Sequence, residues 1–360
     1  MQLFTCQVCG QTLYFENSRC TGCGSELGYL PDSTQLTALR GAGNGSWLPE
    51  GAAQGSPRYR KCGNYAEYGV CNWMIPEHET QTLCTACRLN TTIPDPGLQN
   101  ARTLWRQLEV AKHRLVYSLL RLGLPVVPRQ ENPEKGLAFA FEGNAGAVTG
   151  HADGLITIDT AEADPAARES VRERLAERYR TLLGHFRHES GHYYWDLLVR
   201  DSQWLEDFRK HFSDETTDYS AALQRHYEQG APPDWQQAFI SAYATAHPWE
   251  DWAETWAHYL HMLDTLETAS VFGVHLNPPQ HTPSSSARLE NLDPYRHEDF
   301  RTLLDHWLPV TLALNSLNRS MGLPDPYPFV LSAASIDKLG FVHTLVHAVT
   351  ALQEDTAGST

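Results

Sequence analysis

The 360-residue chain has no apolar run long enough to cross a membrane and no excess of positive charge. A spanning helix needs about 20 apolar residues, and the longest apolar stretches here are interrupted by charged side chains. Residues 1–6 lack the basic and apolar regions of a signal peptide. The formal net charge of −15 disfavours nucleic acids and anionic membranes as partners. We therefore expect a cytoplasmic protein without a membrane or nucleic-acid partner.

Cysteine is absent beyond residue 87, and the eight cysteines form two groups of four. The first group is Cys6, Cys9, Cys20 and Cys23, and the second is Cys62, Cys71, Cys84 and Cys87. The first consists of two C-x-x-C pairs, each followed by glycine, which is typical of a zinc ribbon, and the second ends in one such pair. Disulfides are disfavoured because nothing indicates secretion, and a redox role because no β-α-β pattern surrounds the pairs. We expect two structural zinc sites, each with four thiolate ligands.

One pair among the 17 histidines has the spacing of a metal site. His188 and His192 lie in residues 165–200, where apolar periodicity predicts one long helix with Asp164 as its N-cap. Residues four apart share a helix face, so both imidazoles can bind one ion, and Glu189 can reach a water on that ion as general base. This is the HExxH arrangement of zinc peptidases, in which zinc lowers the pKa of its water to about 7. A chance match is expected at roughly the few-per-cent level, and the helical context favours a real site.

Two histidines leave a catalytic zinc one protein ligand short. The metzincin pattern is excluded because Trp195 and Leu198 stand where it requires glycine and histidine. A carboxylate on a later helix is the alternative, and Glu250 and Glu254 share a face of the helix predicted over residues 249–268. One of them can bind zinc while the other accepts the N–H of a ligand histidine. Both could instead be charges on a solvated face, which three neighbouring tryptophans disfavour.

Residues 250–254 resemble the third-ligand helix of the gluzincin branch of HExxH peptidases, which reads E-x-x-A-[DE]. This resemblance implies that Glu250 is the zinc ligand and that Glu254 supports a ligand histidine. It also implies that Tyr243, seven residues before Glu250, donates a hydrogen bond to the transition-state oxyanion. The competitors for that role are Tyr193, Tyr194 and Tyr259.

Over nearly its whole length the sequence resembles a bacterial family of zinc-binding metallopeptidases with an N-terminal zinc ribbon. The motifs that carry the resemblance are the cysteine groups and residues 68–73, 84–90, 150–157, 188–196 and 250–255. The expected fold is α+β: two small N-terminal four-cysteine zinc modules followed by a helix-rich, zincin-like metallopeptidase domain with a small sheet. By the same resemblance, residues 150–158 are a candidate edge strand for pairing with a substrate backbone. His151 could line the cleft, although the sequence favours a surface histidine beside a turn.

The composition along the chain predicts the domain boundaries. We expect a zinc ribbon over residues 1–28, a Gly-, Ser- and Pro-rich linker over 29–57, a second four-cysteine module over 58–97, and the metallopeptidase domain over 98–355. In the last domain, periodicity predicts helices over residues 100–122, 235–247, 249–268, 297–321 and 336–352, and strands over 137–141 and 155–158.

The function that we expect is zinc-dependent hydrolysis of peptide bonds, with one catalytic and two structural zinc ions. His188, His192 and Glu250 would hold the catalytic ion, and Glu189 would act as general base. The substrate would be a peptide or protein, and a protein partner could bind through the zinc modules. One alternative is a non-catalytic zinc-ribbon adaptor or scaffold, which the intact general base disfavours. The other is a zinc amidohydrolase on a non-peptide substrate, which the sequence does not separate from a peptidase.

Overall fold

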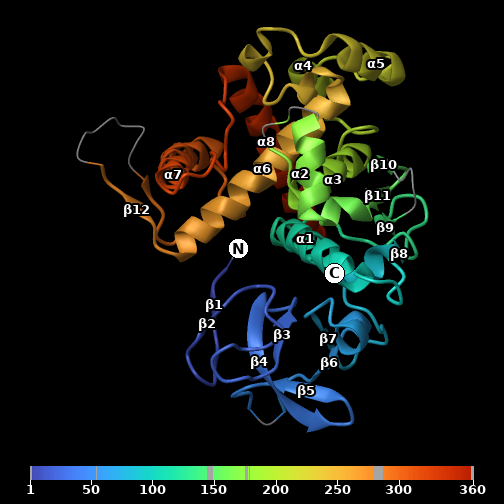
Figure 1. The fold of residues 1–360 in the computed structure, drawn as a ribbon, viewed down its shortest axis with the longest axis vertical. Helices are drawn as coiled ribbons and strands as arrows, with labels where there is room; N and C mark the ends of the chain where they lie inside the picture. The colour runs from blue at the N-terminus through green and yellow to red at the C-terminus, as the bar shows by residue number, and fades with distance from the viewer. Residues whose placement is uncertain are drawn as a thin grey trace.

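The computed structural model describes residues 2–53, 55–143, 149–174, 177, 179–278 and 287–357. Strands dominate the N-terminal part of these residues and helices the remainder (Figure 1). The expected α+β class is confirmed, with two N-terminal four-cysteine clusters followed by a helix-rich domain with small sheets. None of the described helices is long and apolar enough to cross a bilayer.

The N-terminal part contains two antiparallel sheets. The smaller pairs β1 (Phe4–Thr5) with β2 (Thr12–Leu13). The larger has the order β3-β4-β5-β6-β7. Its strands are β3 (Leu27–Leu30), β4 (Gln35–Gly43), β5 (Ser46–Pro49), β6 (Tyr59–Lys61) and β7 (Met74–Pro76). The second cysteine group lies on and around β6 and β7, next to a π-helical turn (Asn64–Tyr68) and a 3-10 turn (Cys87–Leu89).

The linker predicted over residues 29–57 is wrong, because this segment supplies β4 and β5 at the centre of the larger sheet. Gly43 pairs with Ser46, so Asn44 and Gly45 form a two-residue hairpin loop. Both loop residues have positive φ, 52° and 77°. Asn-Gly is the preferred sequence for that hairpin turn, since the tight turns whose twist matches the strands need positive φ. The glycines therefore encode a hairpin, and one continuous sheet joins the two cysteine groups.

The second part begins with a four-stranded sheet of order β10-β11-β9-β8. Its strands are β8 (Asn90–Thr92), β9 (Ala138–Glu142), β10 (Gly150–Ala152) and β11 (Leu155–Asp159). β8, β9 and β11 are parallel, and β10 runs antiparallel to β11 at the edge. The predicted strands over 137–141 and 155–158 are confirmed within one residue at their ends. A further pair, β12 (His275–Leu276) and β13 (Ala287–Arg288), projects from the helical region.

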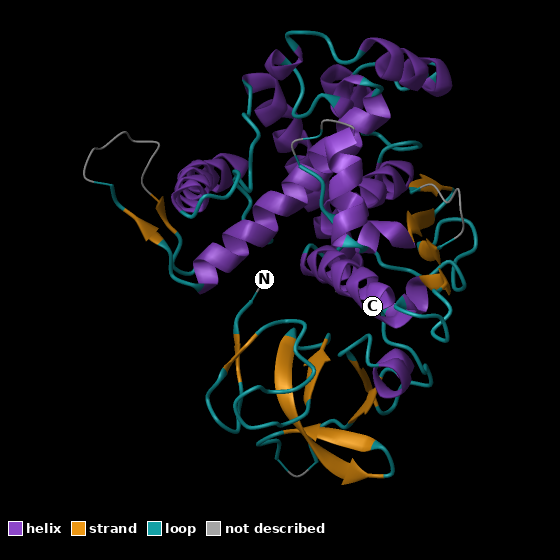
Figure 2. Cartoon of the chain, viewed as in Figure 1, coloured by secondary structure: helices purple, strands orange, loops and turns teal. Residues whose placement is uncertain are grey.

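Eight α-helices make up most of the described second part, as Figure 2 shows in purple. They are α1 (Ala101–Arg121), α2 (Pro165–Arg174), α3 (Leu182–Leu198), α4 (Leu205–Phe212), α5 (Tyr219–Gln229), α6 (Pro248–Val271), α7 (Phe300–Ser320) and α8 (Ala333–Ala357). The helices predicted over 100–122, 249–268, 297–321 and 336–352 are confirmed as α1, α6, α7 and α8.

The helix predicted over 235–247 is wrong, because this segment forms only two 3-10 turns, Trp235–Gln237 and Tyr243–Thr245. Side chains bind backbone groups that a continuous helix would use. Lys338 Nζ donates to the carbonyl of Ala238 (2.7 Å), and the Ser241 hydroxyl accepts from the N–H of Ala244 (3.1 Å). Such bonds compete directly with the helical ladder.

The single helix predicted over 165–200 is also wrong, because the chain forms α2 and α3 with a break between them. Residues 175, 176 and 178 lie outside the described residues, and 179–181 are not helical. Asp164 caps α2 as expected, accepting from the N–H of Ala166 at 2.8 Å. A second cap, Thr181, accepts from the N–H of Gly184 at 3.0 Å and starts the helix that carries the histidines.

The pairing of α3 with α6 positions the candidate site. A Cβ on Gly191 would lie 2.9 Å from the Cα of Ala253, so only glycine allows the two helices to approach this closely. The Nε1–H of Trp252 donates to the carbonyl of Gly191 (2.8 Å), and that of Trp256 donates to the Ser190 hydroxyl (3.1 Å). Ser190 and Gly191, the two variable positions of the HExxH motif, therefore hold α3 against α6.

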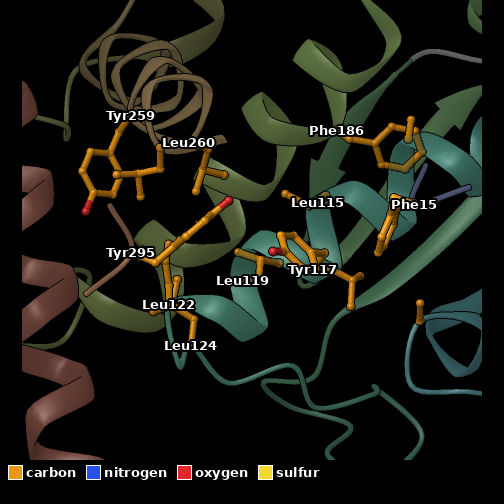
Figure 3. Packing of buried hydrophobic residues seen from close by; sticks show 14 of the residues in the cluster. Phe15, Leu115, Tyr117, Leu119, Leu122, Leu124, Phe186, Tyr259, Leu260 and Tyr295 are labelled. Carbon is orange, nitrogen blue, oxygen red and sulfur yellow. The ribbon is translucent and has the colours of Figure 1, made fainter. Parts of the chain in front are cut away.

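Helix α1 connects the two parts of the molecule. Tyr117 on α1 packs edge-on against Phe15 of the zinc-ribbon part, with ring centroids 5.3 Å apart (Figure 3). The Tyr117 hydroxyl donates to Glu267 (2.6 Å), and the Ser118 hydroxyl donates to Asp264 (2.6 Å), both on α6. Asp264 also pairs with Arg187 on α3. The apolar face of α1 and this buried polar network hold α3 and α6 against the zinc-ribbon part.

Candidate metal sites

Three potential metal ligands meet where α3 crosses α6. His188 and His192 lie one turn apart on α3, and their Nε2 atoms are 3.3 Å apart. Glu250, in the first turn of α6, places Oε2 at 3.0 Å from Nε2 of His188 and 3.6 Å from Nε2 of His192. These atoms lie within 4.8 Å of one another, close enough for a single ion to bind all three.

Glu254 binds the opposite side of His188. Its Oε1 lies 2.8 Å from Nδ1, so the Nδ1–H donates to the carboxylate. A proton on Nδ1 leaves the neutral imidazole with its lone pair on Nε2, which faces Glu250. A carboxylate behind a ligand histidine is the usual arrangement in zinc sites. The sequence resemblance assigned this position to Glu254.

The donor set fits a cation. Glu250 Oε2 is buried and accepts no hydrogen bond from the described residues, although two imidazole nitrogens lie close to it. When the His188 proton is on Nδ1, the lone pair on its Nε2 points toward Glu250 Oε2. Two hydrogen-bond acceptors then face each other, an arrangement that a bound cation stabilises. Burial acts to raise the pKa of Glu250, but the adjacent imidazoles of His192 and His188 lower that pKa well below its ordinary value. The Glu250 carboxylate is therefore ionised.

Glu189 occupies the general-base position of the motif. Its side chain is buried, and the charged neighbours that act on it include His188, His192 and Glu250. Burial raises the pKa of the Glu189 carboxyl above its ordinary value. A base with a raised pKa holds a transferred proton better near neutral pH, which suits the role.

Among the candidate oxyanion donors, Tyr243 is the one beside the histidines. Its ring centroid lies 6.0 Å from that of His188, and burial raises the pKa of its phenol. The hydroxyls of its three competitors bind groups outside the site. Tyr193 donates to the carbonyl of Lys135, Tyr194 to that of Pro125, and Tyr259 bonds to His343 Nδ1.

The edge strand β10 carries His151 to the same site. The His151 ring lies parallel to that of His192, with centroids 6.3 Å apart, and its Nε2 accepts from the N–H of Gly154 (3.0 Å). Burial lowers the pKa of His151 to about 3, so this imidazole is neutral near pH 7. His151 therefore lies beside one of the two histidines of the motif.

Tyr219 also contacts the site, although no motif or spacing in the sequence indicates it. This residue begins α5, and its hydroxyl donates to Oε1 of Glu250 at 2.6 Å. The two residues are 31 positions apart and belong to different helices, so no local spacing relates them.

Each cysteine group brings its four sulfur atoms within 4.8 Å of one another, as a four-thiolate zinc site requires. In the first group, Cys6 and Cys23 sulfurs are 3.7 Å apart, and Cys9 and Cys20 sulfurs 3.6 Å apart. All eight cysteines are free of disulfides. The two clusters therefore fit structural zinc.

The second cluster has neighbours on α1 that no cysteine spacing indicates. Cys71 and Cys84 sulfurs are 3.8 Å apart, and Nε2 of His113 on α1 lies 3.3 Å from the Cys71 sulfur. His113 binds the carbonyl of Glu109 through Nδ1, and the Glu109 carboxylate lies 3.9 Å from the Cys87 sulfur. The second cluster is therefore lined by α1 as well as by its own module.

The structure thus combines an N-terminal pair of four-cysteine clusters with a helical domain in which the two histidines of an HExxH motif meet a glutamate. Comparison with known proteins gives the family. Residues 101–345 match the family described as "Putative zinc-binding metallo-peptidase", to which the chain belongs, and residues 3–97 match a zinc-ribbon domain. This confirms the resemblance seen in the sequence.

Relatives of similar length occur in mycobacteria. Proteins of Mycobacterium bovis and of two strains of Mycobacterium tuberculosis, each titled "Uncharacterized protein", are 43% identical over 354 residues. The alignment covers 97% of this chain and 96% of each relative. No solved structure matches the chain.

Proposed function

We propose that this protein is a zinc-dependent peptidase whose site lies between α3 and α6. The observation that carries the proposal is the convergence of His188 Nε2, His192 Nε2 and the buried Glu250 Oε2. Zinc bound there would lower the pKa of a water and polarise the scissile carbonyl. The two four-cysteine clusters would hold structural zinc. The expected cytoplasmic location and a protein partner at the zinc-ribbon part belong to the same proposal.

The side chains around the site have separate roles in this proposal. Glu189 takes a proton from water and passes it to the leaving amine. Glu254 holds His188 in the tautomer with its proton on Nδ1. Tyr243 donates a hydrogen bond to the carbonyl oxygen as it gains charge. Glu189 thus transfers the proton, Glu254 orients His188, and Tyr243 stabilises the developing charge.

Strand β10 provides a place for an extended peptide. It is the last strand of its sheet, and its outer edge pairs with no other described strand. Its free N–H and C=O groups can bind a peptide backbone as an added strand. Since His151 on β10 lies beside His192, a backbone bound along β10 would run past the metal ligands. This favours a peptide over a small non-peptide amide.

The test is Glu189→Gln, assayed with a broad mixture of peptides beside wild type. Loss of the general base should lower kcat/KM by about 10²- to 10⁴-fold while the zinc content is retained. Glu169→Gln is the matched control, since Glu169 is exposed on α2 and pairs with Arg172 of the same helix. A Glu189→Gln variant that cleaves at the wild-type rate would refute the proposal.

Two other outcomes would select the alternatives. A wild-type protein that holds zinc at His188 but cleaves only small amides would be a zinc amidohydrolase. A wild-type protein that hydrolyses neither class would be an adaptor or scaffold.

A further inference from the structure

The Glu250 carboxylate is bound asymmetrically. Oε2 faces the two imidazoles, and Oε1 accepts a 2.6 Å hydrogen bond from the Tyr219 hydroxyl. The carboxylate is almost fully buried, with 1% of its side-chain surface exposed. Because water has so little access, Tyr219 determines what Oε1 can bind.

We propose that Tyr219 is a positioning residue that makes Glu250 a one-oxygen metal ligand. This inference rests on the proposed function and extends it to a residue outside the HExxH and third-ligand motifs. A carboxylate can bind a cation through one oxygen or through both. With Oε1 bound to Tyr219, only Oε2 remains for an ion held by the two histidines.

The restriction matters because catalytic zinc needs an open position. Catalytic sites keep three protein ligands and leave the fourth position for water or substrate, whereas structural sites are closed. A carboxylate that binds through both oxygens would occupy that position. By keeping Glu250 to one metal-binding oxygen, Tyr219 thus leaves the fourth position of the ion open for water or substrate.

The Tyr219 side chain is held firmly enough for this role. Its ring packs edge-on against His247 (5.1 Å between centroids) and at a tilt against Trp249 (5.8 Å). His247 accepts from the N–H of Trp249 (3.1 Å) and bonds through Nε2 to the carbonyl of Thr217 (3.1 Å). Asp218 caps α5 by accepting from the N–H of Ala221 (2.9 Å). These contacts tie the start of α5 to the start of α6, where Glu250 lies.

Tyr219 and Tyr243 make different contacts and should be separable by experiment. Tyr219 binds the ligand carboxylate itself, whereas the ring of Tyr243 lies against His188. Loss of the Tyr219 hydroxyl should alter the environment of the bound ion. Loss of the Tyr243 hydroxyl should lower kcat and leave that environment unchanged, because Tyr243 would act on the substrate oxygen.

The test replaces the site zinc with cobalt, whose visible absorption is intense when four-coordinate and weak when five-coordinate. A chelator removes the site zinc and cobalt is added back; metal analysis should then give one cobalt and two zinc per chain. Wild type and Tyr243→Phe should show the intense spectrum. Tyr219→Phe, which keeps the ring packing, should lose it, and its kcat should fall about 10- to 100-fold with little change in KM.

A wild-type spectrum and kcat in Tyr219→Phe would overturn the inference and leave the proposed function intact. A wild type that binds cobalt but hydrolyses nothing would refute the peptidase, while the spectra would still decide the role of Tyr219. A wild type that binds no cobalt at these ligands would overturn both.

Discussion

The two cysteine clusters have the same ligands but different surroundings. In the first cluster Cys9 and Cys23 are exposed, whereas all four cysteines of the second are buried. The second cluster also contacts α1 through His113 and Glu109. One four-cysteine cluster thus lies at the surface of the ribbon part, and the other lies inside the junction between the ribbon part and the helical part.

The contacts around the second cluster continue toward the HExxH site. The Glu109 carboxylate accepts from the half-buried Asn90 (2.6 Å) and the buried Trp105 (2.9 Å) and pairs with the buried Lys112 at 2.8 Å. Helix α1 then packs directly on α3, the helix of His188 and His192. We therefore expect loss of zinc from the second cluster to disturb the whole chain, and loss from the first to have a local effect.

The largest predicted effect is that of Cys84→Ser in the buried cluster. A structural zinc contributes about 10–16 kcal/mol of apparent binding free energy, comparable with the whole stability of a domain, about 5–15 kcal/mol. Cys84→Ser should abolish cooperative thermal unfolding, measured by circular dichroism. Cys23→Ser, the matched change in the exposed cluster, should lose one zinc and keep the cooperative transition. If both variants kept the cooperative transition, or both lost it, the two clusters would not differ in their importance for stability.

A smaller effect is predicted for His113→Ala, which removes the contact from α1 to the Cys71 sulfur but leaves all four thiolates. Zinc should bind the second cluster about 10- to 100-fold more weakly, and the free energy of unfolding should fall by about 1–3 kcal/mol. Zinc release to a chromogenic chelator and denaturant titration measure the two quantities.

The control for His113→Ala is its neighbour on α1. Arg114 pairs with Glu16 of the ribbon part, and both side chains are partly exposed. Arg114→Ala should change the free energy of unfolding by less than about 1 kcal/mol. If the two alanine variants release zinc at the same rate, α1 does not support the second cluster.

Local sequence predicted most of the fold and the ligand-bearing motifs. Helix geometry alone puts His188 and His192 on one face of α3 and Glu250 and Glu254 on one face of α6, and the structure brings these two faces together. The two segments that were predicted wrongly as a linker and as one long helix contain turn and capping residues. Asn44-Gly45 encodes a hairpin, and Thr181 interrupts a continuous apolar periodicity by capping a new helix.

The contacts that were missed lie far apart in the chain. Tyr219 is 31 residues from Glu250, and His113 is 42 residues from Cys71. Periodicity and motif spacing describe neighbours on one element, whereas these pairs depend on how α5 meets α6 and how α1 meets the ribbon part. A single sequence contains no local pattern for such packing, so these supporting residues emerge only from the structure.

The central claim, a zinc ion held by His188, His192 and Glu250 in addition to two cysteine-bound ions, is tested most directly by metal analysis. Wild-type protein should contain about three zinc ions per chain, since each four-thiolate cluster and the HExxH site would hold one ion. His188→Ala should remain folded and contain about two. Two zinc ions in both proteins would contradict the claim, because the HExxH site would then bind no metal.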